Sequence, residues 1–447
     1  MKDAAHRASW QICPRCGRET GILFPETRCP SCGELLEVRH APPELRGAEL
    51  AALFTARSAK RTGLDASGVW RYRELVLPGA DAYVVTHPEG NTPLLESPAI
   101  SKWAGLSRLS IKHEGHNPTG SFKDRGMTVG ITEARRIGAS AVACASTGNT
   151  SASLAAYAAL AGIPALVFVP SGQVASGKLA QTLAYGARTL IVRGDFDACL
   201  ALAVESSRKL GVYLLNSVNP FRLEGQKTIV FEALEQLSWE PPDWIVLPAG
   251  NLGNTSAFGK ALREARELGL IQRVPRLAAV QAAGANPFAR SFRDGFAAMH
   301  PVKAETLATA IRIGDPASHE RGVEAIRSTG GVVTDVPDRE ILEAKAAVDA
   351  AGIGCEPASA ASIAGARRLV REGIIGSADT VIAVLTGHIL KDPGLILAYH
   401  QEMDPPPPGA NRPIEIEPLL FEVERVLGKS RVESREGEGE LSTGLKL

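Results

Sequence analysis

The sequence has few cysteines, no excess of either charge and no secretory segment. Its 447 residues include seven cysteines, too few for the disulfide framework of a secreted protein, and 49 basic residues balance 49 acidic ones. A neutral chain has no overall field to attract nucleic acid or an anionic membrane. The N-terminus lacks the apolar core of a signal peptide. We therefore expect a cytoplasmic protein with no nucleic-acid partner and no membrane partner.

One uncharged stretch is long enough to suggest a membrane span. No charged residue occurs between Arg136 and Lys178, and about 18 consecutive apolar residues can form such a span. Polar and turn-forming segments interrupt the stretch at Ser146–Thr150, Gly162–Pro164 and Pro170–Gly172. This punctuation indicates strands, turns and a small-residue helix instead of a span.

From Leu109 onward, short apolar runs alternate with longer helical stretches. The predicted strands are Leu109–Lys112, Ala141–Ala145, Ala165–Val169, Thr189–Val192, Tyr213–Leu215, Trp244–Leu247, Leu277–Gln281, Val332–Asp335 and Val381–Leu385. The predicted helices include Phe122–Ile137, Thr150–Ala161, Asp197–Leu210 and Thr255–Leu268. Such alternation predicts an α/β fold, with helices on both faces of mostly parallel sheets. Ligands then bind at the carboxyl ends of the strands, beside helix N-termini.

The composition changes near residue 40 and again at Asp404–Gly409, a proline run that cannot continue a helix. We predict an N-terminal module over residues 1–40 and a catalytic core over 41–403. Within the core we expect two α/β subdomains, the smaller over roughly 105–225. Residues 404–447 are predicted to form a proline-rich linker and a charged tail, with a short helix around Leu419–Leu427 and a disordered end.

Four cysteines form two matched pairs, Cys13 with Cys16 and Cys29 with Cys32, each in the pattern Cys-Pro-x-Cys-Gly. The proline bends the turn and the glycine permits a positive φ, so that each pair can present two thiolates to one tetrahedral ion. We therefore expect zinc-ribbon-like knuckles that bind a structural Zn²⁺, since four thiolates leave no open position for catalysis. A redox dithiol pair is the alternative.

A lysine stands in the first turn of the predicted helix Phe122–Ile137, within the polar segment His116–Gly126. A helix N-terminus disfavours a cation and lowers the pKa of an amine. That setting suits a lysine that must be neutral to attack an aldehyde. Considered alone, Lys123 can also be interpreted as an ordinary solvated lysine on the surface.

Three further polar loops follow predicted strands. Ser146–Ser153 contains more hydroxyl and amide groups than a helix cap requires, which indicates a polar ligand. In Pro248–Thr255, glycines at 250 and 253 allow successive N–H groups to curl around a phosphate. Leu385–Pro393 places Thr386 at a strand end, where its hydroxyl can meet a ring nitrogen. With the lysine, these loops supply the groups needed to hold pyridoxal phosphate.

These motifs resemble the threonine synthases, in the same order, from about Glu89 to Pro393. The matching segments are Glu89–Leu94, Asn117–Gly126, Thr147–Thr150, Asn216–Lys227, Gly250–Asn254, Glu356–Ser362 and Thr386–His388. One departure is Ile389, where the family pattern has glycine. The resemblance implies the two-domain tryptophan-synthase-β-like fold of pyridoxal-phosphate enzymes, known as fold type II, and a homodimer.

The resemblance also implies a role for individual residues. Lys123 is the implied cofactor-linked lysine and catalytic base, with Asn149 at the ring hydroxyl oxygen and Thr386 at the pyridine nitrogen. The implied binding residues for the cofactor phosphate are Gly250, Asn251, Leu252, Gly253 and Asn254. The implied substrate is O-phospho-L-homoserine, which reacts with water to give L-threonine and phosphate. The implied substrate-binding residues are Thr150, Asn216, Ser217 and Arg222, the last offering a guanidinium fork to a phosphoryl group.

Two other functions remain open at this point. The first is another enzyme of the same fold, a serine or threonine dehydratase or a cysteate synthase acting on phosphoserine; Lys123–Gly126 and Thr386–His388 favour threonine synthase. The second is a zinc-ribbon adaptor whose enzyme body is a vestige. The intact Lys123 and the unbroken loop over Gly250–Asn254 argue against the adaptor. For Arg222 the alternative is a surface arginine on a helix.

Overall fold

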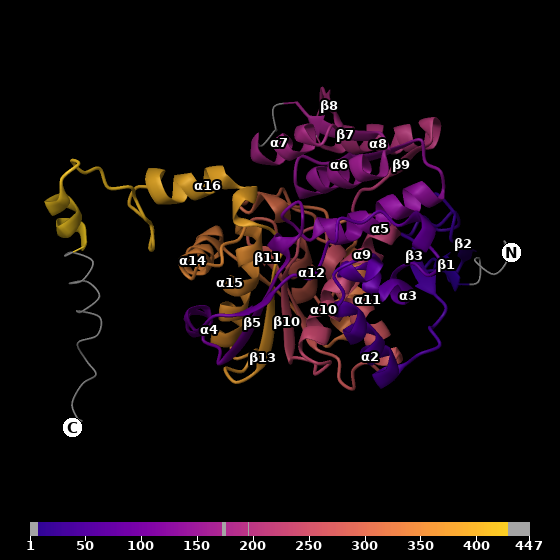
Figure 1. Cartoon of the computed structure of the whole chain (residues 1–447), viewed down its shortest axis with the longest axis horizontal. Helices are drawn as coiled ribbons and strands as arrows, with labels where there is room; N and C mark the ends of the chain where they lie inside the picture. Colours follow the sequence, from indigo (N-terminus) through magenta and orange to yellow (C-terminus); the bar gives the residue numbers. More distant parts are fainter. Residues whose placement is uncertain (1–7, 172–175, 195, 428–447) are drawn as a thin grey trace. The chain divides into compact units, whose positions relative to one another are not determined.

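The computed structural model describes residues 8–171, 176–194 and 196–427. It confirms the α/β fold with mostly parallel sheets (Figure 1). The larger sheet contains, in spatial order, β12 (Val332–Val336), β11 (Arg276–Ala282), β10 (Trp244–Pro248), β13 (Thr380–Leu385), β5 (Arg108–His113) and β4 (Leu94–Glu96). The smaller sheet contains β8 (Arg188–Val192), β7 (Ala165–Pro170), β6 (Ala141–Ala145) and β9 (Val212–Leu214).

All strand pairs in these two sheets are parallel except β4 with β5, which is antiparallel. Each predicted strand is present, with no end shifted by more than one residue; Leu215, for example, lies just beyond β9. The strand β4 was not predicted from the sequence. That strand is only three residues long and half-exposed, so it has neither the length nor the buried apolar pattern by which strands are recognised.

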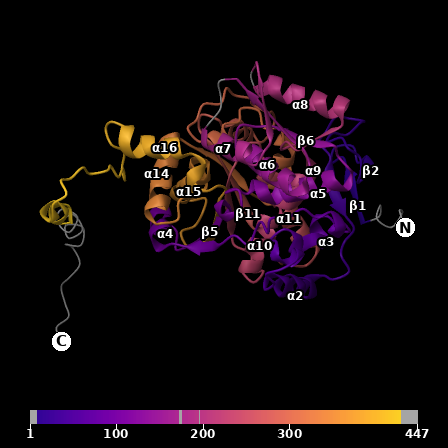
Figure 2. The ribbon, with the colours of Figure 1, turned by 45° about the horizontal axis from the view of Figure 1, so that its top comes forward.

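Helices connect the strands and cover the sheets. Up to the end of the core they are α2 (Gly47–Ser58), α3 (Arg73–Val76), α4 (Pro98–Ala104), α5 (Lys123–Arg136), α6 (Asn149–Ala161), α7 (Ser176–Ala184), α8 (Phe196–Leu210), α9 (Pro220–Gln226), α10 (Thr228–Gln236), α11 (Gly253–Glu267), α12 (Pro287–Arg293), α13 (His319–Ser328), α14 (Asp338–Ala350), α15 (Pro357–Arg371) and α16 (Pro393–Leu397). The smaller sheet and its helices form a separate layer, and α5 lies between that layer and the rest of the core (Figures 1 and 2).

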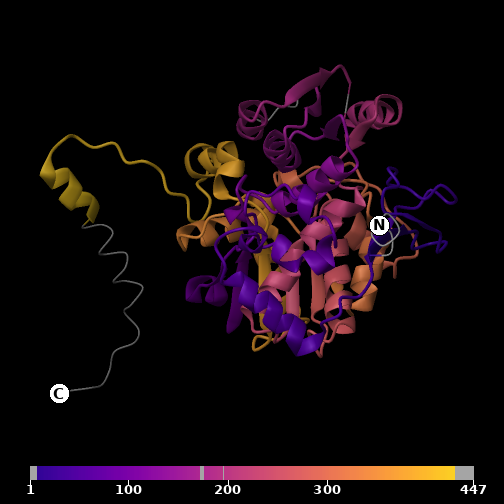
Figure 3. The same ribbon diagram turned by 45° about the vertical axis from the view of Figure 1, so that its right-hand side comes forward.

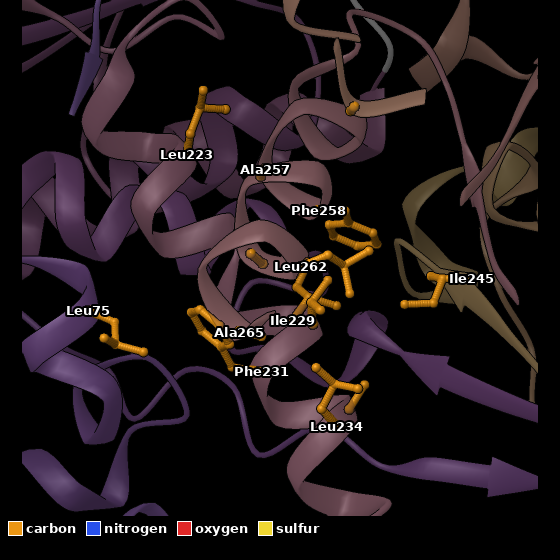
Figure 4. Packing of buried hydrophobic residues seen from close by; sticks show 14 of the residues in the cluster. Leu75, Leu223, Ile229, Phe231, Leu234, Ile245, Ala257, Phe258, Leu262 and Ala265 are labelled. Carbon is orange, nitrogen blue, oxygen red and sulfur yellow. The ribbon is translucent and has the colours of Figure 1, made fainter. Parts of the chain in front are cut away.

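The largest apolar cluster surrounds α10 and α11 (Figure 4). Phe258 and Leu262 of α11 pack with Ile245 of β10 and with Leu234 of α10, and all four side chains are buried. Burial of large apolar side chains is the main favourable contribution to folding. The cluster therefore fixes α11, whose first residues follow the glycine loop at the end of β10.

The first part of the described chain forms a three-stranded antiparallel sheet in the order β2 (Glu19–Gly21), β1 (Ser9–Ile12) and β3 (Glu37–His40). Two tight turns carry the cysteine pairs, and Gly17 and Gly33 adopt φ angles of 71° and 75°. The sequence pattern predicted this glycine conformation. In Figure 3 these strands, at the right of the view, lie beside the part of the core that contains the larger sheet.

A buried ionic cluster joins this N-terminal sheet to the core. Glu224 of α9 contacts His40 Nε2 at 2.9 Å, Lys227 Nζ at 2.5 Å, and Lys260 Nζ. Lys260, on α11, also donates to the carbonyl oxygen of Val38 in β3. The two lysines hold the pKa of Glu224 far below its ordinary value despite burial. The sheet is thus anchored by charge to two helices of the core.

The core unit ends at Leu395 and a second compact unit begins at Ile396. Within the second unit, a short π-helix covers Ala398–Glu402 and a helix covers 420–427, where the sequence predicted one. The predicted disordered end lies outside the described residues. No helix in the described parts of the chain combines the length and apolar character needed to cross a membrane.

Candidate active site

The predicted site residues lie where parallel strands end and helices begin. Lys123 and Asn149 are the first residues of α5 and α6, and Asn216 follows β9. Gly250 follows β10 and Thr386 follows β13. These positions belong to the carboxyl edges of both sheets, where an α/β fold binds its ligands.

The loop after β13 contacts the start of α5 directly. The Phe122 N–H donates to the Thr386 carbonyl at 3.0 Å, and Ser121 pairs with Gly387 in an isolated antiparallel bridge. A Cβ at Gly387 would lie 2.3 Å from Glu356 Oε1, so only glycine fits there. The backbone at Thr386 is therefore fixed against the backbone that carries Lys123.

The amine of Lys123 lies 4.0 Å from the centre of the Phe122 ring. Burial, helped by the nearby guanidinium of Arg222 and opposed by Glu356, lowers the pKa of Lys123 to about 7. Burial and Arg222 thus act in addition to the helix dipole that the sequence analysis invoked. A lysine of this kind has a large neutral fraction near pH 7, which is the form that attacks a carbonyl and accepts a proton.

Asn149 contacts Glu356, which directly precedes α15, and Thr386 contacts Ser359, which lies within α15. The Asn149 Nδ2 donates to both carboxylate oxygens of Glu356, at 3.1 and 2.9 Å. The Thr386 hydroxyl pairs with the Ser359 hydroxyl at 2.9 Å. Glu356 and Ser359 lie in a matching segment but were not predicted to have a role. Their contacts with Asn149 and Thr386 arise only in the folded structure, so the sequence offered no more than polar side chains in a matched segment.

The Gly250–Asn254 loop forms a cradle at the start of α11. Leu252 adopts a left-handed φ of 63°, and no side chain caps this helix within the described chain. A Cβ at Gly250 would lie 3.1 Å from the Ile311 Cα, so the loop packs closely there. In the described structure, Asn254 Oδ1 and Thr255 Oγ1 are buried without a hydrogen-bond partner. Uncapped N–H groups and the Thr255 hydroxyl, which can donate, fit a bound phosphate, whereas the Asn254 oxygen can only accept.

Arg222 is completely buried, so the surface alternative for it is wrong. Its Nη1 donates to the Leu215 carbonyl at 3.0 Å, while Nε and Nη2 have no partner among the described residues. Burial lowers the pKa of Arg222 to about 10, which leaves it charged at neutral pH. An unpaired buried guanidinium is costly, and an anion that contacts its two remaining nitrogens would compensate for that cost.

The other predicted substrate residues differ in their surroundings. The Ser217 hydroxyl accepts from Asn251 Nδ2 at 2.9 Å, which connects this loop to the glycine cradle. The Asn216 Oδ1 accepts from the Ala145 N–H at 3.0 Å, and its Nδ2 donates to the Ala145 carbonyl at 3.1 Å. The side chain therefore connects β6 to the chain after β9. Thr150 lies half-buried in the first turn of α6.

A buried ionic network supports the first turn of α5. Arg125 contacts Glu114 through Nε at 2.7 Å and Nη2 at 2.8 Å, and its Nη2 also contacts Glu232 at 2.8 Å. Lys112 contacts the same Glu232 oxygen at 2.7 Å, and all four side chains are fully buried. Arg125 is two residues from Lys123. The network therefore fixes the position of the lysine without entering the site.

The four predicted metal ligands lie together in the N-terminal sheet. The Cys13 and Cys32 sulfurs are 3.4 Å apart, and the Cys16 sulfur lies 3.6 Å from Cys29 and 3.7 Å from Cys32. All four sulfurs lie within 4.8 Å of one another. Zn–S bonds of about 2.3 Å in a tetrahedron place sulfurs about 3.8 Å apart, so the arrangement fits a zinc ion.

Comparison with known proteins gives consistent matches. The family described as pyridoxal-phosphate dependent enzyme matches residues 85–387. A threonine synthase of Methanosarcina acetivorans is 46% identical over 392 residues, covering 87% of this chain and 94% of the relative. One of Methanocaldococcus jannaschii is 42% identical over 419 residues, covering 93% and 99%.

Solved structures with this fold include threonine synthase from Escherichia coli, with a TM-score of 0.60 at 20% identity and 88% coverage of both chains. Maize serine racemase has a TM-score of 0.59 at 20% identity, covering 84% of this chain and all of that chain. At these identities the structural likeness supports the fold alone.

Proposed function

The chain belongs to the threonine synthases within the pyridoxal-phosphate-dependent enzyme family, and from this membership we propose its reaction. It converts O-phospho-L-homoserine and water to L-threonine and phosphate, the last step of threonine biosynthesis, as a carbon–oxygen lyase acting on a phosphate. The structural observation that carries the proposal is a buried arginine with two unpaired nitrogens beside a lysine of lowered pKa. The arginine, Arg222, suits binding of the substrate phosphate, and the lysine, Lys123, suits the proton transfers.

Pyridoxal phosphate, when bound, supplies the electron sink that stabilises negative charge on substrate carbon. We assign Lys123 as its covalent attachment point and Gly250, Asn251, Leu252, Gly253 and Asn254 as the residues that hold its phosphate. Asn149 would bind the ring hydroxyl oxygen and Thr386 would face the pyridine nitrogen. The uncapped start of α11 supports the assignment of the phosphate-binding residues.

The hydroxyl pair of Thr386 and Ser359 bears on the type of reaction. A neutral hydroxyl at the pyridine nitrogen does not stabilise a ring cation as a carboxylate would. Electron withdrawal is then tempered, which suits elimination and replacement better than transamination. This agrees with a reaction in which phosphate leaves and water adds.

Lys123 is the residue that moves protons. Once the substrate amine has displaced it, its amine can remove the proton at Cα and then one at Cβ, and can return a proton afterwards. A pKa near 7 allows it to accept and release protons at neutral pH. Arg222, which affects this pKa, would bind the phosphoryl group that departs from Cγ, with Ser217, Thr150 and Asn216 at the same end of the site.

Two experiments test the reaction. Borohydride reduction followed by peptide mapping should place the cofactor label on Lys123; a label elsewhere, or none, contradicts the assignment. Phosphate release from phosphohomoserine should exceed release from phosphoserine. Preference for phosphoserine would indicate a β-replacement enzyme such as a cysteate synthase. A colourless protein that pyridoxal phosphate does not change would indicate an adaptor.

We further propose that Cys13, Cys16, Cys29 and Cys32 bind a structural Zn²⁺ in a zinc-ribbon-like module over residues 1–40. The sulfur separations and the antiparallel sheet support this. Metal analysis should find one zinc per chain. A metal-free protein with intact stability would contradict the assignment.

The family resemblance also leads us to propose a homodimer, to be tested by analytical ultracentrifugation, in the cytoplasm. None of the seven cysteines, all of which lie in the described residues, forms a disulfide, which suits a reducing compartment.

A further inference from the structure

Glu356 is a buried carboxyl group to which the reaction scheme above gives no role. It directly precedes α15, and only 1% of its surface is exposed. Both of its oxygens accept a hydrogen bond from Asn149 Nδ2, at 3.1 and 2.9 Å, and Oε1 lies 3.4 Å from the Thr386 hydroxyl oxygen. The carboxyl group therefore touches both residues that are assigned to the cofactor ring.

Three segments are built around this carboxyl group. The backbone N–H of Glu356 donates to the Gly387 carbonyl at 3.0 Å, which joins the start of α15 to the loop after β13. A side chain at Gly387 would collide with the carboxylate, at 2.3 Å for a Cβ. Asn149 approaches from the first turn of α6. The position of Glu356 is thus determined by contacts at the site and not by the packing of a helix surface.

The contact fixes the orientation of Asn149. An ionised carboxylate only accepts hydrogen bonds, so the amide must turn its nitrogen toward Glu356. The nitrogen carries two hydrogens, and when the two carboxylate oxygens share one of them, the other remains for a ligand oxygen. Without the carboxylate, the amide could turn its oxygen to the same place and would then repel an anionic ring oxygen.

Two charged groups in the described part of the chain, Arg222 and Glu356, act on the Lys123 amine. Lys123 comes from α5 and Arg222 from α9, and burial together with Arg222 lowers the pKa of Lys123 while Glu356 raises it. The neighbouring Cys355 thiol is neutral, because burial raises its pKa far above the ordinary value. Glu356 is therefore the anion that counters burial at Lys123. An ionised carboxylate is costly to bury, and such groups concentrate at functional sites.

We propose that Glu356 is a positioning residue of the cofactor site, which orients the Asn149 amide and supplies the negative charge that keeps the Lys123 nitrogen protonated in the cofactor-bound enzyme. This inference depends on the proposed function, because it concerns the nitrogen that links the cofactor to the chain. It gives a specific electrostatic role to Glu356, which is not among the site residues implied by the family resemblance.

The test is a pH titration of the visible absorption band of the holoenzyme, from about pH 6 to about pH 10. The band of the protonated form should disappear at a lower pH in E356Q than in the wild type, by about one pH unit or more, which is the usual effect of one close charge. Glutamine keeps the size of the side chain. E356D, which keeps the charge but not the reach to Asn149, should titrate between the two.

The matched control is E133Q. Glu133 is also a buried carboxyl group, lies on the same helix as Lys123, and pairs with Arg136 at 2.6 Å. Its replacement should leave the titration of the band unchanged. Circular dichroism and thermal unfolding show whether each variant folds.

A folded E356Q enzyme that titrates like the wild type overturns the inference. If E356Q does not fold, E356D serves as the test. An E356D enzyme whose absorption band titrates like that of the wild type also overturns the inference. A failure of the proposed function has a different result, since the band itself would then be absent and borohydride would leave no label on Lys123.

Discussion

Replacement of Arg222 by methionine is the sharpest test of the substrate site. Methionine keeps an unbranched stem, so the contacts of Arg222 with α5 at Gly126 and Gly130 are retained. The guanidinium has two nitrogens free for a ligand in the described structure. A hydrogen bond to a charged group contributes about 1.5–3 kcal/mol, so two contribute about 3–6 kcal/mol. At about 1.4 kcal/mol per tenfold, we expect kcat/KM for phosphohomoserine to fall by about 10²–10⁴.

The same substitution should not destabilise the protein. It removes one hydrogen bond from the charged group to the Leu215 carbonyl, a loss of about 1.5–3 kcal/mol. It also removes a buried charge without a counter-ion, whose burial costs several kcal/mol. The thermal unfolding temperature of R222M should therefore equal or exceed that of the wild type. Inorganic phosphate, the product, should raise that temperature for the wild type and not for R222M, because only a folded state that binds phosphate gains stability from it.

R125M is the matched control. Arg125 is equally buried but is paired with Glu114 and Glu232, so its removal takes the ion pair from Glu114 and leaves Glu232 with Lys112 and Arg71. We expect a loss of about 3–5 kcal/mol in the free energy of unfolding, measured by urea denaturation. If R222M instead loses stability as R125M does and retains normal kcat/KM, Arg222 belongs to the structural core and the substrate assignment is wrong.

Three further predictions follow from the site and the N-terminal module. K123A should lose turnover by about 10⁴-fold or more in a phosphate-release assay, because both the covalent link and the base are removed; near-normal turnover would refute its role. C29S, or chelation of zinc, should lower the unfolding temperature with little change in kcat, since four thiolates form a closed site; lost catalysis with unchanged stability would contradict a structural ion. E224Q should lower the free energy of unfolding by about 3–5 kcal/mol in urea denaturation, because Lys227 and Lys260 lose a buried counter-ion. As a control, substitution of the exposed Glu205, which pairs with Lys209, should change the free energy of unfolding by less than about 1 kcal/mol.

The regular elements of the core could be predicted from the sequence because each had a local cause. Trp244–Pro248 is an uncharged apolar run with every residue buried, and Lys123–Arg136 follows a polar turn and ends in two arginines that suit a helix C-terminus. The short edge strand Leu94–Glu96 had no such local cause. It exists because β5 offers it a free edge, and that is a property of the assembled sheet.

The site was accessible from the sequence only where a loop carried its own chemistry. The glycines at 250 and 253 and the lysine at 123 could be identified from local geometry. Glu356 could not, because its role depends on Asn149, which is 207 positions away in the chain and meets it only in the folded structure. The burial of Arg222 likewise depends on the approach of α9 to α5 at Gly126 and Gly130, two positions without side chains.

The contrast between Arg125 and Arg222 gives a physical basis for separating structural from ligand-binding groups in this protein. Both guanidinium groups are fully buried, but the fold provides two carboxylates for one and a single carbonyl for the other. Folding alone cannot favour a buried charge without compensation. Unpaired atoms also occur elsewhere, for example in Trp10 and Thr189, so the lack of a partner is not sufficient by itself. The proposal of a ligand at Arg222 rests also on its place where strands end, near the lysine of α5, and the partner that would compensate for its charge is an anion.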